Sequence, residues 1–181
     1  MKKYFLLTAF GKDRPGIVAG VSEVLFELGG NIEDASMTRL GGEFSMMLVT
    51  ALPSAASPAQ IEKRFHPLQK KLGLQVALKP IPPAMARRSK DGPAKFLLSV
   101  YGADRPGIVH QIAQALSKRQ VSITDLQTKV VGSPQKPVYV MLLEVQVPAA
   151  LDLDDLRTDL DTLRQDLKVE ISLQDIEAVP L

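Results

Sequence analysis

The chain contains one long internal repeat, and this repeat constrains the fold more than any other feature of the sequence. The hexapeptide DRPGIV occurs at Asp13–Val18 and again, without a mismatch, at Asp104–Val109, 91 residues later. Beyond Gly132 the offset becomes 95, and we attribute the four-residue difference to a lengthened hairpin loop at 133–137. Two copies of one domain are therefore expected to fill most of the chain.

The 181 residues divide into a first domain at 1–78, a linker at 79–94 and a second domain at 95–181. The linker is rich in proline, which predicts a semi-rigid spacer. It also contains four basic residues against one acidic residue, while the net charge of the whole chain is only +2. The small basic excess therefore lies in the linker, and we interpret it as a solvated segment and not as a surface for polyanions.

Hydrophobic periodicity predicts the same elements in both copies. In the first copy we expect a strand over 3–11, a helix over 14–28, strands over 31–40 and 44–52, a helix over 58–72 and a strand over 74–78. Ser57, Pro58 and Gln60 have the pattern of a capping box at the start of the second helix. The order β-α-β-β-α-β predicts an α+β fold: two tandem ferredoxin-like domains, each an antiparallel sheet with two helices on one face.

Composition excludes several functions that this architecture can support. The chain has no Cys and only two His, at 66 and 110, so we expect neither a metal site nor a cofactor. Aromatic residues make up 5%, and the third strand lacks the signature of an RNA-recognition motif, which argues against nucleic-acid binding.

The amino-terminal sequence has the pattern of a secretory signal, but the same pattern recurs at Lys95–Tyr101. We interpret both as buried strands. No apolar run approaches the roughly 20 residues that span a bilayer. We therefore expect a cytoplasmic protein without a membrane partner.

The repeated DRPGIV segment lies between the first strand and the first helix of each copy. Proline suits the first turn of a helix, and glycine allows close approach of a ligand to the backbone. The N–H groups of Gly16, Ile17 and Val18 then form a site where the helix dipole favours a carboxylate. The alternative is ordinary capping of the helix by Asp13; the exact duplication of the segment favours a function.

With these motifs the sequence resembles the ACT domain family of amino-acid-sensing modules. The resemblance rests on GKDRPGIV at 11–18, GADRPGIV at 102–109 and GGNIED at 29–34, and it covers both copies. Two such domains without a catalytic domain are similar to the glycine cleavage system transcriptional repressor family.

In ACT domains the ligand contacts the loop after the first strand of one module and the start of the second strand of a neighbouring module. The resemblance therefore implies these ligand-binding residues: Asp13, Arg14, Pro15, Gly16, Ile17, Val18, Asn31 and Ile32 in the first copy, and Asp104, Arg105, Pro106, Gly107, Ile108, Val109, Ser122 and Ile123 in the second.

Two differences between the copies bear on these sites. Ser122 replaces the Asn that the family and the first copy have, and its shorter side chain offers fewer hydrogen bonds. His110 replaces Ala19 directly after the motif, and it either lines the second site or is an exposed helix residue.

The resemblance implies a non-enzymatic regulatory protein that binds a small amino acid, with glycine favoured, and that modulates a protein partner such as a transcription regulator. The chain has no helix-turn-helix signature, so direct nucleic-acid binding is not expected. Two alternatives stay open: a regulatory subunit related to formyltetrahydrofolate deformylases, whose amino-terminal domain has a similar motif, and a structural dimerisation module. The domains could pair within one chain or in a homodimer.

Six aspartates lie along the last helix or directly before it, at positions 152, 154, 155, 159, 161 and 166. We interpret them as a solvated face, with docking of a basic partner as the alternative.

Overall fold

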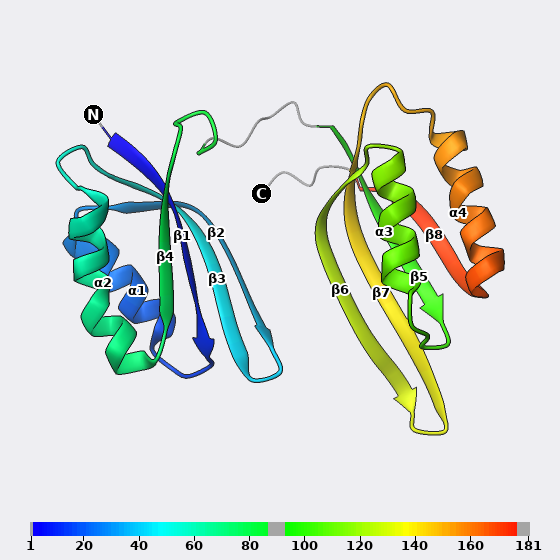
Figure 1. Cartoon of the computed structure of the whole chain (residues 1–181), viewed down its shortest axis with the longest axis horizontal. Helices are drawn as coiled ribbons and strands as arrows, with labels where there is room; N and C mark the ends of the chain where they lie inside the picture. The colour runs from blue at the N-terminus through cyan, green and yellow to red at the C-terminus, as the bar shows by residue number, and fades with distance from the viewer. Residues whose placement is uncertain (1, 87–92, 177–181) are drawn as a thin grey trace. The chain divides into compact units, whose positions relative to one another are not determined.

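The computed structural model describes residues 2–86 and 93–176, and these form two compact units divided between Ser89 and Lys90 (Figure 1). We call them domain 1 and domain 2 and describe each by itself. The linker residues Arg87, Arg88 and Lys90, to which the basic excess was assigned, lie outside the described residues.

The order of elements is the predicted one in both domains. Domain 1 contains β1 (Lys2–Lys12), α1 (Ile17–Glu27), β2 (Asn31–Leu40), β3 (Glu43–Pro53), α2 (Pro58–Leu72) and β4 (Gln75–Ile81). Domain 2 contains β5 (Ala94–Gly102), α3 (Ile108–Lys118), β6 (Ser122–Ser133), β7 (Lys136–Val147), α4 (Leu153–Leu167) and β8 (Val169–Asp175). The sheets are antiparallel, with strand orders β2-β3-β1-β4 and β6-β7-β5-β8, which confirms the βαββαβ fold.

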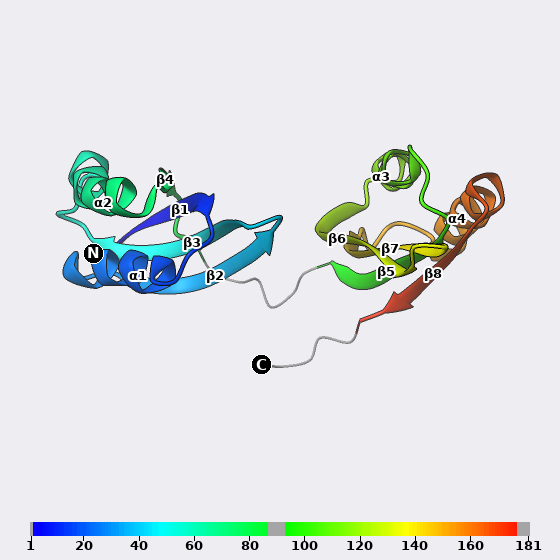
Figure 2. The same cartoon turned by 90° about the horizontal axis from the view of Figure 1, so that it is seen from below.

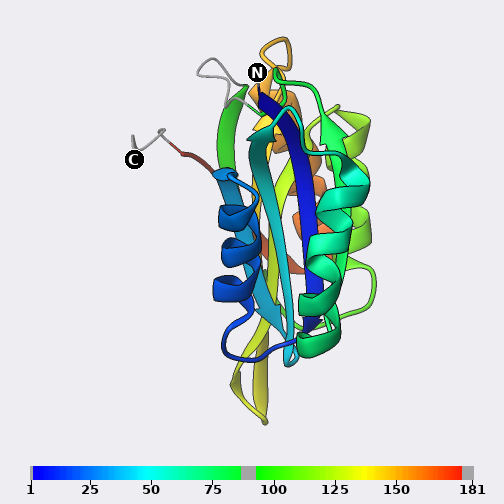
Figure 3. The same cartoon turned by 90° about the vertical axis from the view of Figure 1, so that its left-hand side faces the viewer.

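The two helices of each domain cover the same face of its sheet. Every second residue in the middle of β1 is buried, because successive side chains of a strand point to opposite faces. These strand residues pack with the buried stripes of both helices in one cluster, which includes Phe5, Leu7, Val21, Leu25, Ile61 and Phe65. Figure 3 shows α1 and α2 side by side over the first sheet, and in Figure 2 α3 and α4 lie on one side of the second. Domain 2 has a separate core cluster of its own.

The helices do not cover the edge strands β2 and β6. All residues of β6 are exposed, and in β2 only Asp34 is partly buried. Both strands carry a bulge at the same place, between Ile32 and Asp34 in β2 and between Ile123 and Asp125 in β6. One edge of each sheet is therefore open for contact with another molecule or module.

The structure corrects three predicted boundaries. Helix α1 begins at Ile17 and not at Arg14, because Gly16 adopts a left-handed conformation that a helix cannot contain. Strand β4 continues to Ile81, three residues beyond the predicted end of this strand at 78. The capping box of α2 is confirmed, with Gln60 N–H donating to Ser57 Oγ and Ser57 N–H donating to Gln60 Oε1.

The third correction concerns the hairpin of domain 2, where a lengthened loop was predicted. Two residues connect the strands in both hairpins: Gly41 and Gly42 in domain 1, Pro134 and Gln135 in domain 2. The four additional residues instead lengthen the strands, two in β6 and two in β7, and Figure 1 shows this hairpin extending past the neighbouring strand β5. The prediction of a longer loop is therefore wrong.

Two of the six aspartates belong to an ion-pair cluster between the helices of domain 2. Arg119, the C-cap of α3, donates two hydrogen bonds to Asp159, from Nε (2.7 Å) and from Nη2 (3.2 Å), and Nη1 donates to Asp155 (3.2 Å). This hydrogen bonding lowers the pKa of Asp159 and raises the pKa of Arg119. Asp155 is exposed, as expected for a solvated face, whereas Asp159 is partly buried against Arg119 and departs from that interpretation.

We expect this cluster to make the stability of domain 2 fall in acid. A carboxyl group whose pKa is lowered on folding stabilises the folded state above its unfolded pKa of about 3.9, and the contribution is lost as pH falls through the folded pKa. Thermal unfolding of the wild type and of Asp159→Asn, followed from pH 7 to pH 2, measures this. The variant should be slightly less stable at pH 7, and the difference should vanish at the acid end. A difference that persists in acid would contradict the assignment.

Candidate functional site

The loop between β1 and α1 holds the repeated motif and is shaped by Gly16. This residue is the N-cap of α1 and has φ +93°, a region that L side chains rarely adopt. A Cβ at this position would meet no atom within 4 Å, so the backbone conformation and not space requires glycine. Gly107, the N-cap of α3, has the same conformation with φ +97°.

The first turn of α1 presents uncapped N–H groups. The first hydrogen bond at this end of the helix runs from Gly20 N–H to the Gly16 carbonyl (2.9 Å), so the N–H groups of Ile17, Val18 and Ala19 precede it. No side chain caps either α1 or α3, whereas Ser57 caps α2 and Asp152 caps α4. Neither α1 nor α3 has an acidic residue in its first turn. The amino ends of the first helices can therefore accept an external carboxylate.

Asp13 does not cap α1, so the capping alternative is wrong. The Asp13 carboxylate instead lies 2.7 Å from Nε of Arg39, near the end of β2. The backbone N–H of Asp13 donates a hydrogen bond to the Gly42 carbonyl (2.9 Å). The loop is thus fixed to the β2–β3 hairpin, and the Asp13 charge is neutralised beside the helix terminus.

The loop of domain 2 lacks this neutralisation. Val130 lies at the repeat position of Arg39, and Asp104 forms no ion pair within residues 2–86 and 93–176. The Tyr139 hydroxyl, which donates to Met141 Sδ (3.8 Å), is near Asp104 instead. Burial raises the pKa of Tyr139 and the Asp104 carboxylate raises it further, while Thr128 lowers it. The two loops share a sequence but differ in charge.

Two of the predicted site residues have buried side chains. The side chains of Ile17 and Ile108 are buried in the cores of their domains, which leaves their N–H groups for a ligand. Asp13 is partly buried, and the other predicted residues are exposed: Arg14, Pro15, Gly16, Val18, Asn31, Ile32, Asp104, Arg105, Pro106, Gly107, Val109, His110, Ser122 and Ile123.

Within one domain the structure does not bring the two halves of the predicted site together. The loop precedes α1 and the start of β2 follows it, so the 11 residues of α1, roughly 16 Å at 1.5 Å per residue, separate them. Asn31 Nδ2 donates to Glu33 Oε1 (3.3 Å) at the far end. In domain 2, Ser122 and Ile123 line a hollow of about 280 Å³ beside the end of α3.

Arg39 and Tyr139 were not predicted as site residues. Both approach the loop from distant strands, and no local pattern marks such a contact. The comparison of the copies gave no clear signal either, because Arg39 corresponds to Val130 in a strand of which only Ile32 and Asp34 are repeated, as Ile123 and Asp125.

No group of three or more His, Cys, Asp or Glu side chains in residues 2–86 and 93–176 is placed to hold a metal ion. In the same part of the chain, no helix has the length and apolarity to cross a membrane.

Comparison with known proteins identifies a domain family that matches both halves of the chain. The family model described as "ACT domain" matches residues 3–79 and 94–174. A UPF0237 protein of Streptococcus mutans is 41% identical over 71 residues, which cover 39% of this chain and 81% of that protein.

Two further relatives extend over both domains. The glycine cleavage system transcriptional repressor of Escherichia coli is 25% identical over 175 residues, which cover 94% of this chain and 88% of the repressor. The crystal structure of an unknown protein from Galdieria sulphuraria superposes with a TM-score of 0.83 at 26% identity, covering 98% of this chain and 100% of that one. The chain therefore belongs to the ACT domain family, as two ACT domains in tandem, and is related to the glycine cleavage system transcriptional repressor.

Proposed function

We propose that this ACT-domain regulatory protein senses a small amino acid, with glycine favoured, and modulates a transcription regulator in response. The ligand binds between the β1–α1 loop of one ACT domain and the start of the second strand of a neighbouring one. The observation that carries the proposal is the contrast in capping: the first helix of each domain has no side-chain cap, while the second helix has one.

The uncapped N–H groups of Ile17, Val18 and Ala19 suit the carboxylate of an amino acid, because the helix dipole adds a partial positive charge there. Asn31 supplies an amide that can accept from the ligand's ammonium group and donate to its carboxylate. These groups suit the two charges that every α-amino acid carries, and the relationship to the glycine cleavage system transcriptional repressor favours glycine among them.

A neighbouring domain can supply the missing half of the site. The loop and Asn31 lie at opposite ends of α1, so two domains packed with their α1 helices antiparallel place each loop beside the other's strand start. An exposed apolar strip along α1 and β2 offers the contact surface: Val18, Phe26, Ile32 and Met37. We assign the stronger site to two copies of domain 1, because only domain 1 combines Asn31 with a neutralised Asp13.

Binding would act by linkage. A ligand that touches both domains favours the paired state by its differential affinity, and a partner that recognises the paired state then binds more tightly. The relationship to the glycine cleavage system transcriptional repressor supports transcription of the glycine cleavage genes as the output.

Calorimetry of the full chain against all twenty amino acids tests the ligand. We expect glycine to bind most tightly and Asn31→Ser to weaken it, while Ser122→Asn serves as the matched substitution in domain 2. If no amino acid releases or absorbs heat in the monomer or the dimer, the sensor is excluded and a structural dimerisation module stands in its place.

Deletion of the gene tests the output. Glycine cleavage transcripts should become insensitive to added glycine in the deletion strain, and the wild-type gene should restore the response while the Asn31→Ser gene should not. Transcripts that respond equally in both strains would exclude this output.

Replacing Arg39 with Val, the residue that domain 2 has, should weaken glycine binding. The Asp13 carboxylate then carries an unneutralised charge beside the site and repels the ligand carboxylate. Stability should change little, by about 0–1 kcal/mol, as is usual for exposed ion pairs. Calorimetry at low and high salt measures the effect, which should shrink as salt rises. Unchanged affinity at low salt would show that Arg39 only supports the loop.

A further inference from the structure

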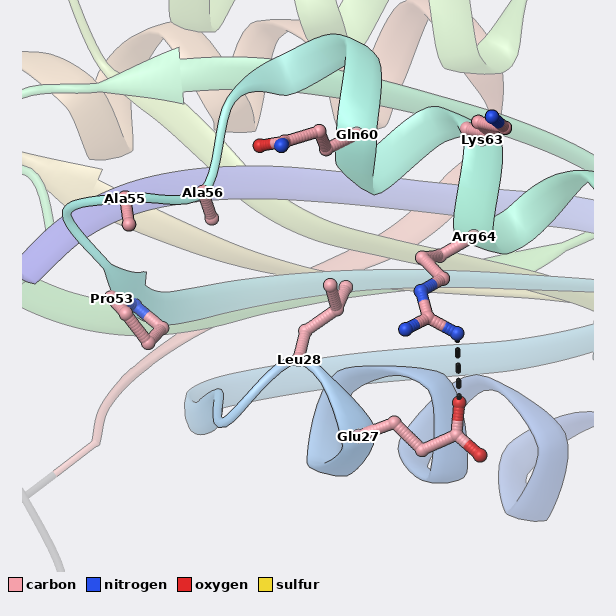
Figure 4. Close-up of a pocket in the computed structure, with 8 residues that line it drawn as sticks. All are labelled: Glu27, Leu28, Pro53, Ala55, Ala56, Gln60, Lys63 and Arg64. Carbon is pink, nitrogen blue, oxygen red and sulfur yellow. Dashed lines mark ion pairs between the residues drawn. The ribbon is translucent and has the colours of Figure 1, made fainter.

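A cleft on the helical side of domain 1 contains a second set of complementary charges. It has a volume of about 670 Å³ and lies between the carboxyl end of α1, the connection after β3 and the first turns of α2 (Figure 4). In Figure 4, Arg64 of α2 points toward Glu27 of α1, and Leu28 projects into the cleft beside this pair. None of these residues belongs to the site at the β1–α1 loop.

The ion pair in the cleft is weak. Arg64 Nη1 lies 3.9 Å from Glu27 Oε2, and both side chains are more than half exposed. Gln60 Oε1 is engaged by Ser57, and its amide nitrogen makes no hydrogen bond within the described part of the chain. Lys63 adds another positive charge to the lining. The cleft therefore has hydrogen-bonding capacity that its own groups do not use.

The charges in the cleft are opposite to those that the helix ends favour. The last turn of α1 contains Glu27 and no basic residue, although a helix carboxyl end favours a cation. The first turn of α2 has no acidic residue, although this end favours an anion. In the second turn Lys63 and Arg64 line the cleft, while the neighbouring Glu62 lies outside the lining. One wall of the cleft thus favours an added cation and the other an added anion.

In domain 2, side chains of the protein itself occupy the position that corresponds to the cleft. By the repeat, Leu28 corresponds to Arg119, Arg64 to Asp159 and Gln60 to Asp155. There the guanidinium of Arg119 lies at the carboxyl end of α3 and binds both aspartates at 2.7–3.2 Å. Domain 2 supplies from its own chain a cation at one helix end and anions at the other, while domain 1 leaves the cleft open.

We propose that the cleft of domain 1 binds the zwitterion of an aliphatic α-amino acid. The ammonium group lies against Glu27 and the carboxyl end of α1. The carboxylate lies against Arg64 and Lys63, with a hydrogen bond from the Gln60 amide. The aliphatic side chain packs on Leu28, Pro53 and Ala56, which with Ala55 form the apolar part of the lining. This site is separate from the glycine site at the loop.

NMR titration of the ¹⁵N-labelled full chain with L-leucine tests the proposal. Amide shifts should appear at Glu27, Leu28, Ala56 and residues 60–64, and the corresponding positions in domain 2 should not move. Removing either charge of the probe should weaken binding about tenfold or more, since each charge makes charge-assisted hydrogen bonds. The probes for this are 4-methylpentanoate, which lacks the ammonium group, and 3-methylbutylamine, which lacks the carboxylate.

Substitutions in the cleft test which side chains bind the two charges of the ligand. Glu27→Gln and Arg64→Gln should each weaken leucine binding about tenfold, while Glu62→Gln, on the same helix but outside the lining, should not. The double variant Leu28→Arg with Arg64→Asp copies the arrangement of domain 2 and should abolish binding without lowering the melting temperature, which circular dichroism measures.

Three results would overturn the proposal: no leucine-induced shifts in the cleft, equal binding of 4-methylpentanoate, or unchanged binding in the double variant. The glycine site is read separately from the amides of residues 16–19. If glycine shifts the amides of the loop but leucine shifts none in the cleft, the cleft proposal fails and the proposed function stands. If leucine shifts the cleft amides but glycine shifts none in the loop, the proposed function fails and the cleft proposal stands.

Discussion

Gly16→Val abolishes glycine binding if the β1–α1 loop holds the ligand. Gly16 has φ +93°, and a residue with a Cβ pays roughly 1–2 kcal/mol for a left-handed backbone. Relief of this strain rotates the first-turn N–H groups away from the carboxylate, and the valine methyl groups cover the space that is open beside Gly16. Calorimetry with glycine and thermal unfolding of the same sample separate lost binding from lost stability.

Gly73→Val is the matched control. Gly73 is the C-cap of α2, has φ +67°, and an added Cβ there also meets no atom within 4 Å. The strain is comparable, but the residue lies outside the loop, so this variant should lose stability and keep glycine binding. Equal loss of binding in both variants would mean that general destabilisation, and not the loop, explains the result.

Mixing two inactive variants tests whether the site is shared between copies. In a two-fold pair, each site takes its loop from one chain and Asn31 from the other. After exchange between Gly16→Val and Asn31→Ser chains, about a quarter of all sites combine an intact loop with an intact Asn31, and binding should return to that extent. No recovery after demonstrated exchange would exclude a site shared between two copies of domain 1.

The second large effect concerns the core. Phe65 on α2 is 1% exposed and packs in the domain 1 cluster, so Phe65→Ala should cost about 3–5 kcal/mol of unfolding free energy. Because the two domains have separate core clusters, the loss should appear in the unfolding of domain 1 alone. Hydrogen exchange followed by NMR resolves the two domains. Equal loss of protection in β5 and β7 would show that the domains unfold as one unit.

The sequence predicted elements that depend on local signals and missed contacts that join distant segments. The Ser57–Gln60 capping box is local, and the prediction is confirmed. Proline at position 15 suggested an early helix start, but the left-handed conformation of Gly16 delays the helix to Ile17. Propensity rules place proline in the first turn of a helix. They do not predict that the glycine after it will be the N-cap.

The candidate site shows the same division. The repeated motif was sufficient to select the loop, because identical hexapeptides at an offset of 91 need no structural knowledge. The contact of Asp13 with Arg39 links a loop to the end of a strand 26 positions later, and only the fold brings them within 2.7 Å. The charge difference between the loops follows from such pairings, so it could not be predicted from the motif itself.

The longer hairpin of domain 2 has a consequence for how ACT domains can diverge. Paired residues in an antiparallel hairpin alternate between two hydrogen-bonding types, so a two-residue turn keeps the same closing pair only if each strand grows by an even number. The closing pairs are Leu40–Glu43 and Ser133–Lys136, two positions further along each strand in domain 2. Such a hairpin therefore lengthens by four residues at a time. After gene duplication, one copy can lengthen its β-hairpin in this way without repacking the core of the domain.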